Sequence, residues 1–102
     1  MYKLEYLPIA RADMVEIVRY ISHDLNNPSS AEKLAAEMVN AAEKLVDFPY
    51  SCALHHTLKP LKKEYRKLIV KNYIMFYWVD GEVKKVVIAR VIYFRRDYEK
   101  LL

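Results

Sequence analysis

Hydrophobic positions along the chain change their spacing twice, which separates a short strand, a helical stretch and a β-rich half. Residues 2–7, YKLEYL, alternate apolar and polar side chains and predict a half-buried strand that ends at Pro8. From Ile9 the apolar side chains recur at three- and four-residue steps, which predicts a helix of about four turns. Its apolar stripe consists of Met14, Ile17, Val18, Ile21 and Leu25.

A second helix is predicted after the NNPS connection at residues 26–29. Ser29 and Glu32 have the spacing of a capping box, in which a hydroxyl and a carboxylate satisfy N–H groups at a helix start. Because the connection is short, the two helices should form an antiparallel hairpin. The apolar stripe of the second helix consists of Ala31, Leu34, Ala35, Met38, Ala42 and Leu45.

After Pro60 the pattern becomes that of a β-sheet, with the strands EYRKLIVK, NYIMFYWV and EVKKVVIARVIYF. The first two should be joined by a tight turn at Lys71-Asn72, and the last two by a two-residue turn at Asp80-Gly81. The elements predict an α+β fold, β-α-α-β-β-β, in which an antiparallel sheet of about four strands is covered on one face by the helical hairpin. A short C-terminal helical turn should pack Tyr98 with Leu101 and Leu102.

Two-residue turns also set the register, because they pair Tyr77 with both Arg66 and Lys84. One face of the sheet would then carry basic and aromatic side chains and stay open, while the other would meet the helices. The predicted open face consists of Arg66, Leu68, Val70, Tyr73, Met75, Tyr77, Lys84, Val86, Ile88 and Arg90. The predicted helix-facing side consists of Ile74, Phe76, Trp78, Val87, Ala89 and Val91. A bulge in either strand would exchange these assignments.

Composition and charge narrow the class of protein. The 102 residues are 54% hydrophobic, enough for one compact domain over residues 1–102. Residues 1–58 hold five Lys/Arg against eight Asp/Glu, and residues 59–102 hold twelve against five, so the second half carries +7. Such segregation favours a polyanionic partner. One cysteine, no signal-peptide pattern and no apolar run of membrane-spanning length indicate a cytoplasmic protein without membrane association.

Three successive segments resemble the RelE/ParE superfamily of bacterial toxins from type II toxin-antitoxin systems. They are ADMVEIVRYISHDLNNPSSAEKLAAEMVNAAEKLVDFP, LKKEYRKLIVKNYIMFYWVD and VVIARVIYFRRDYEKLL. The resemblance implies a β-α-α-β-β-β domain and either of two activities. RelE-like members cut messenger RNA in the ribosomal A site, whereas ParE-like members poison DNA gyrase without a known enzymatic step of their own.

For an RNA-cleaving member the resemblance implies attack of a ribose 2′-OH on the neighbouring phosphate, which leaves a 2′,3′-cyclic phosphate. That reaction needs a base, an acid and cations that stabilise charge on phosphorus. Arg66 and Arg90 match basic positions of these members, and Tyr93 and Tyr98 lie near their terminal aromatic residue. These four are the predicted catalytic residues. The predicted RNA-binding residues are Lys59, Lys62, Lys63, Lys67, Arg95, Arg96, Tyr73 and Tyr77.

Both strand arginines interrupt apolar runs, so each must pair with a carboxylate or face a ligand. In the predicted pairing the only carboxylates nearby are Glu64 and Glu82, which favours the ligand and hence an endoribonuclease. One departure favours the gyrase inhibitor instead, or a third alternative, an inactive toxin or generic RNA-binding module, since Ile74 stands where RNA-cleaving relatives often carry an arginine.

His55 and His56 are the remaining candidates for chemistry. Adjacent residues point to opposite sides of an extended chain, and no third ligand stands at metal-binding spacing, so we expect no metal site and no cofactor. One of the two is a candidate general base. The expected partners are a cognate antitoxin, whose acidic or amphipathic segment wraps the domain, and the ribosome with its messenger RNA, or alternatively DNA gyrase.

Overall fold

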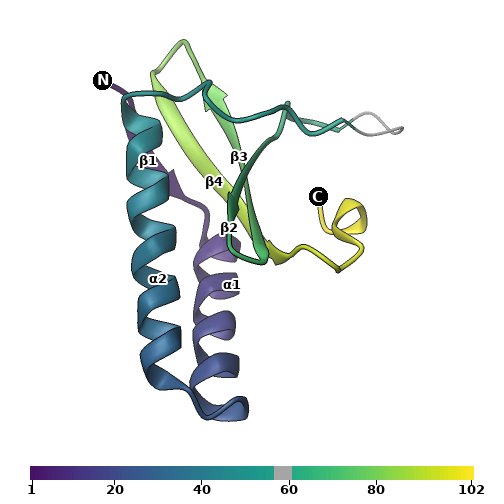
Figure 1. The fold of residues 1–102 in the computed structure, drawn as a ribbon. Coiled ribbons are helices and arrows are strands. Elements are labelled where there is room, and N and C mark those ends of the chain that lie inside the picture. The colour runs from purple at the N-terminus through teal and green to yellow at the C-terminus, as the bar shows by residue number, and fades with distance from the viewer. Residues whose placement is uncertain (57–60) are drawn as a thin grey trace.

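A computed structural model describes residues 1–56 and 61–102 and shows a four-stranded sheet with two helices on one face (Figure 1). The predicted α+β class and the β-α-α-β-β-β order are confirmed, as is the C-terminal helical turn, a 3₁₀ turn at Tyr98–Lys100. The strands and helices are β1 (Lys3–Tyr6), α1 (Pro8–Arg19), α2 (Pro28–Glu43), β2 (Arg66–Val70), β3 (Tyr73–Asp80) and β4 (Lys85–Tyr93).

The sheet is mixed rather than wholly antiparallel. Its strand order is β1-β4-β3-β2, with antiparallel β2–β3 and β3–β4 pairs and a parallel β1–β4 pair. The helical hairpin returns the chain to the end of the sheet where β1 begins, so β2 and then β4 run in the direction of β1 (Figure 1). The first and last strands therefore lie side by side and tie the two ends of the sequence together.

The helices keep the predicted hairpin but not the predicted cap. Asn27, not Ser29, caps α2, because its side-chain oxygen accepts a hydrogen bond from the backbone N–H of Ser30 at 3.3 Å. A π-helical turn at Tyr20–Asp24 continues α1 toward the connection. The predicted stripe of the second helix is buried at Ala31, Leu34, Met38 and Ala42 of α2 and at Leu45 in the 3₁₀ turn that follows it, Lys44–Val46.

The β2–β3 register is the predicted one, with Val70 opposite Tyr73 and Arg66 opposite Tyr77. The β3–β4 register is different, because the connection comprises four residues, 81–84, and pairs Asp80 with Lys85. Gly81 lacks the positive φ that a two-residue turn of the Asp-Gly type requires. Instead, Asp80 Oδ1 accepts hydrogen bonds from the backbone N–H groups of residues 82 and 83, at 3.1 and 3.4 Å.

A β-bulge then changes the faces of β4. Tyr77 pairs with Ile88 but Phe76 pairs with Arg90, so Ala89 is an extra residue in the ladder. Beyond the bulge, inward and outward positions of β4 are exchanged. Arg66 shares a face with Tyr77 and Arg90 shares the opposite face with Phe76, so the prediction that both arginines lie on one face is wrong.

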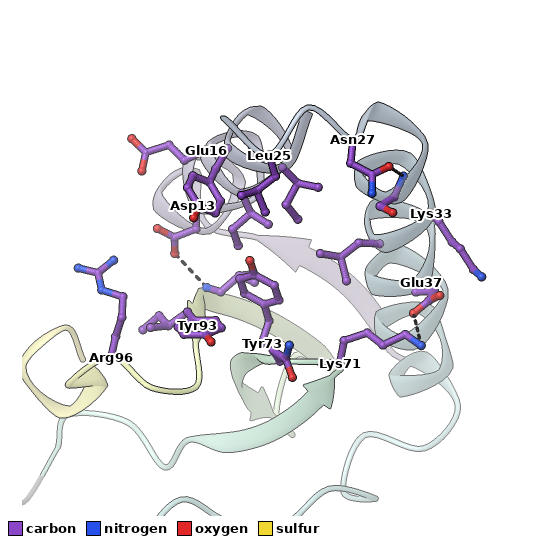
Figure 2. Close-up of a pocket in the computed structure, with 18 residues that line it drawn as sticks. Asp13, Glu16, Leu25, Asn27, Lys33, Glu37, Lys71, Tyr73, Tyr93 and Arg96 are labelled. Atoms are coloured by element: carbon purple, nitrogen blue, oxygen red, sulfur yellow. Dashed lines mark hydrogen bonds and ion pairs between the residues drawn. The ribbon is translucent and has the colours of Figure 1, made fainter. Parts of the chain in front are cut away.

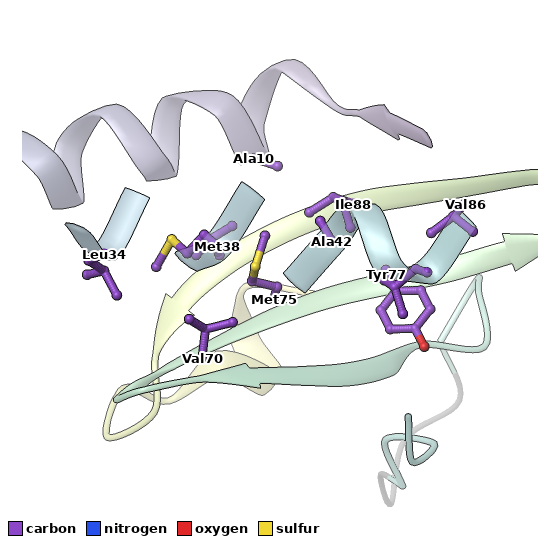
Figure 3. Close-up of a cluster of buried hydrophobic side chains, with 11 residues drawn as sticks. Ala10, Leu34, Met38, Ala42, Val70, Met75, Tyr77, Val86 and Ile88 are labelled. Carbon is purple, nitrogen blue, oxygen red and sulfur yellow. The ribbon is translucent and has the colours of Figure 1, made fainter. Parts of the chain in front are cut away.

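The predicted assignment of faces is also wrong for β2, β3 and the part of β4 before the bulge, whereas Val91, beyond the bulge, faces the helices as predicted. The face expected to be open is the one that packs on the helices, and it forms the main core (Figure 3). Its buried strand residues are Val70, Met75, Tyr77, Val86, Ile88 and Val91. The other face, which we call the outer face, buries Ile74, Phe76 and Ile92 beneath the C-terminal turn. Because β3 and β4 are apolar on both sides, alternation alone did not distinguish the faces.

Candidate functional site

Arg90 lies on β4 and is held by an aspartate that is 77 positions away in the sequence. Its Nε donates to Asp13 Oδ2 at 2.8 Å and its Nη2 donates to Asp13 Oδ1 at 3.0 Å, which makes a bidentate ion pair. Both side chains are largely buried, with 15% and 14% of their surface exposed. Hydrogen bonding to Asp13 raises the pKa of Arg90, so the guanidinium keeps its positive charge.

The same aspartate also closes a free part of the sheet edge. β1 pairs with β4 only as far as Ile88, and Asp13 Oδ2 accepts the next outward N–H, that of Val91, at 2.9 Å. The remaining Arg90 nitrogen, Nη1, donates to the carbonyl oxygen of Leu101 at 3.1 Å. The prediction that Glu64 and Glu82 are the only carboxylates near Arg90 is therefore wrong, and this guanidinium joins α1, β4 and the C-terminal turn.

Arg66 occupies a different place. Its Nη1 donates to the carbonyl oxygen of Cys52 at 2.8 Å, and its guanidinium carbon lies 5.0 Å from the centre of the Tyr50 ring. On the same side of the sheet, the hydroxyl of buried Tyr77 donates to the carbonyl oxygen of Pro49 at 2.9 Å. Both side chains thus fasten the loop after α2 to the sheet.

Tyr98 packs into the cluster on the outer face. Its ring centre lies 5.2 Å from that of Phe76 and 5.6 Å from that of His55. Tyr93, in contrast, points to the helix side, where its ring lies 5.7 Å from that of Tyr73. The four predicted catalytic residues therefore do not converge on one point.

A groove of about 890 Å³ opens between the helical hairpin and the ends of β3 and β4 (Figure 2). Three predicted site residues, Tyr73, Tyr93 and Arg96, line it. Its apolar lining comes from both layers and consists of Ile17, Ile21, Leu25, Leu34, Val91 and Ile92. Its charged rim has both signs and consists of Asp13, Glu16, Glu37, Lys33, Lys71 and Arg96. An apolar floor with a mixed rim is typical of a surface that binds an amphipathic peptide segment.

The other predicted RNA-binding residues are dispersed. Lys63 Nζ lies 5.1 Å from the centre of the Trp78 ring, and the Arg95 guanidinium lies 5.4 Å from that of Phe94. Lys62 is exposed, and half-buried Lys67 lies on β2 with its backbone N–H bonded to the carbonyl oxygen of Ala53. Lys59 and Pro60 lie outside the described residues.

Sequence reasoning missed the contributions of the helices. Asp13 and the Glu37–Lys71 ion pair, 3.8 Å between Oε2 and Nζ, connect the hairpin to the sheet. One available signal was position, since Asp13 is four residues before Ile17 and so borders the apolar stripe of α1. Among the described residues, no group of three His, Cys, Asp or Glu side chains is placed to hold a metal ion, and none of the helices has the length and hydropathy needed to cross a membrane.

Known proteins match both the sequence and the fold. The family model for the ParE toxin of the type II toxin-antitoxin system, parDE, matches residues 4–98. The chromosomal ParDE toxin-antitoxin system from P. aeruginosa is 22% identical, with a TM-score of 0.73 over 91% of this chain and 96% of that chain. The RelBE2 toxin-antitoxin complex from Mycobacterium tuberculosis is 24% identical, with a TM-score of 0.61 over 90% and 96%. No curated protein sequence matches this chain.

Proposed function

The chain belongs to the ParE toxin family of type II toxin-antitoxin systems, and we propose that it inhibits DNA gyrase without enzymatic activity of its own. Its toxin class follows from the family. The target is the open question, since the superfamily also contains ribosome-dependent endoribonucleases, the activity that the sequence favoured. The ParE model and the ParDE likeness lean toward gyrase.

The observation that carries the proposal is the state of Arg90. Phosphoryl chemistry on RNA needs cations that are free to stabilise charge growing on phosphorus. Asp13 balances the charge of the Arg90 guanidinium, and the remaining nitrogen, Nη1, donates to the Leu101 carbonyl. Only 15% of the Arg90 side chain is exposed. Arg66 is engaged with Cys52 and Tyr50 on the opposite face of the sheet. Neither arginine has the freedom that a phosphate ligand requires, which supports binding rather than catalysis.

Two parallel assays test this proposal. Purified toxin added to DNA gyrase and relaxed plasmid should abolish ATP-dependent supercoiling, whereas the same toxin in a translation extract should leave messenger RNA ends unchanged. Toxin premixed with excess antitoxin serves as the control in both assays. Codon-phased cuts in messenger RNA together with normal supercoiling would contradict gyrase inhibition and restore the endoribonuclease interpretation.

The neutralising partner should occupy the groove between the hairpin and the sheet. An amphipathic segment of a cognate antitoxin would place apolar side chains on the floor lined by Ile17, Ile21 and Leu25, and charged side chains on the mixed rim. Charges of both signs, with Lys71 beside Glu37 and with Arg96 on the same rim as Asp13 and Glu16, suit such a segment better than they suit a polyanion.

Leu25→Arg should weaken antitoxin binding at least tenfold while leaving the free toxin folded. Leu25 is 55% exposed at the groove, so the change costs the free toxin little, but it places an unpaired charge against an apolar segment. Isothermal titration with the antitoxin measures the effect. Val15→Arg is the matched control, because Val15 is 53% exposed on α1 but does not line the groove. Equal affinities for both variants would place the antitoxin elsewhere.

A further inference from the structure

His55 is buried without a hydrogen-bond partner. Only 3% of its side-chain surface is exposed, and among the described residues neither ring nitrogen has a partner within hydrogen-bond distance. The imidazole stands edge-on between two aromatic rings, 5.3 Å from the centre of Phe76 and 5.6 Å from that of Tyr98. A neutral imidazole is tolerated in such an apolar site, but a charged one loses its hydration without compensation.

The charged groups around His55 do not compensate for the hydration that a protonated imidazole would lose. Burial is the largest cause that lowers the pKa of His55, and the positive charge of Lys67 on β2 lowers it further. Glu99, on the C-terminal turn, opposes them, but its Oε1 is 3.8 Å from Nε2 and its side chain is 53% exposed. The adjacent residue in the sequence, His56, makes the smallest contribution and also lowers the pKa of His55. The folded state therefore favours the neutral ring.

What lies over the ring is the C-terminal segment, residues 97–102. Tyr98, Leu101 and Leu102 pack on Ile74, Phe76 and Ile92 of the outer face. Among residues 1–56 and 61–102, one hydrogen bond across this contact joins the segment to the sheet, from Arg90 Nη1 to the Leu101 carbonyl. In Figure 1 the turn stands on the side of the sheet away from the helices. Lifting the segment would give His55 access to water without disturbing the main core.

We propose that protonation of His55 releases residues 97–102 from the outer face of the sheet, so that this segment is a pH-sensitive cover. The open form presents Phe76 and the Nη1 edge of Arg90, both covered in the closed form. The cover is a property of the toxin domain itself and does not depend on which target the toxin binds.

The direction of the effect follows from proton linkage. A histidine whose pKa is lowered in the closed form stabilises that form above the ordinary value of about 6.5, and this stabilisation is lost as pH falls toward the lowered value. In the pH window between the ordinary pKa and the lowered one, the ratio of open to closed molecules should rise by up to about tenfold for each unit by which the pH falls.

Hydrogen exchange of the isolated toxin, followed by NMR between pH 7.5 and 5, measures this ratio. The amides of Leu101 and Leu102 both donate to the Tyr98 carbonyl, at 2.9 and 3.2 Å, and report on the closed turn. Their protection factors, corrected for intrinsic exchange, should fall by up to about tenfold per pH unit below 6.5. Core amides of β3 should not change. In His55→Phe, which fills the site with a ring that cannot titrate, protection should not depend on pH.

His56→Gln is the matched control, since His56 is exposed, and it should retain the wild-type pH profile. Glu99→Gln removes the one group that favours the charged imidazole and should move the lower end of the window to more acidic pH. An imidazole titration of His55 at or above pH 6.5 in the wild type would overturn the proposal. So would protection factors of Leu101 and Leu102 that are equal at pH 7.5 and pH 5, or that fall in His55→Phe as in the wild type.

Discussion

Replacing Asp13 with alanine should lower the free energy of unfolding by about 3–5 kcal/mol, because it leaves the largely buried Arg90 guanidinium without its counter-ion. The same change removes the acceptor of the Val91 N–H at the free edge of β4. Such a loss is a large part of the total stability of a small domain. Urea denaturation should show a lower midpoint with an unchanged slope, which identifies a loss of stability without loss of two-state unfolding.

Two further variants separate the ion pair from general damage to α1. Glu16→Ala, at an exposed position on the same helix, should change stability by no more than about 0.5 kcal/mol. Asp13→Leu combined with Arg90→Met should recover part of the loss, because no charge is then left buried without a partner. An Asp13→Ala protein as stable as the wild type would mean that the Asp13–Arg90 pair is not held in solution.

This expected loss changes how activity data on Arg90 should be interpreted. An Arg90→Ala toxin would lack activity if the residue bound a phosphate, but also if the sheet edge and the C-terminal turn simply came loose. The two explanations predict different stabilities. Only a variant that unfolds at the wild-type urea concentration carries information about the target.

Periodicity in the sequence was sufficient to predict the fold, because the apolar pattern of each helix and strand depends on local residue spacing. The stripe through Leu34, Met38 and Leu45 is buried as predicted, and the Lys71-Asn72 turn gives the predicted β2–β3 register. The prediction of the β3–β4 register was wrong because of one local interaction. Asp80 bonds to the backbone two and three residues ahead and lengthens the connection to four residues.

The site was less predictable because its decisive contacts are not local. The Ala89 bulge exchanges the faces of β4, and no signal in ARVIY distinguishes a bulged from a regular strand. The Asp13–Arg90 pair joins residues 77 positions apart, and a carboxylate on the edge of an amphipathic helix resembles any solvated charge. Arginine in an apolar strand correctly indicated that a partner was needed, but it did not identify the partner.

Phe76→Ala should lower the free energy of unfolding by about 3–5 kcal/mol, because Phe76 is fully buried at the centre of the outer-face cluster. Its ring contacts His55, Tyr65 and Tyr98, so the cavity would open beneath the C-terminal turn as well as within the sheet. Thermal or urea unfolding measures the global effect. Hydrogen exchange should also show that the amides of Leu101 and Leu102 lose protection before the main core unfolds.

Phe94→Ala is the control of the same residue type. Phe94 is 43% exposed and packs on Tyr93, so its removal should cost no more than about 1 kcal/mol. The comparison tests whether the outer face is a true second core. If the two variants were equally stable, the C-terminal turn would not be packed on Phe76. The outer face would then be open to solvent. The sequence pattern predicted such an open surface for the opposite face of the sheet. A large difference would instead mean that any partner of the outer face must first displace residues 97–102.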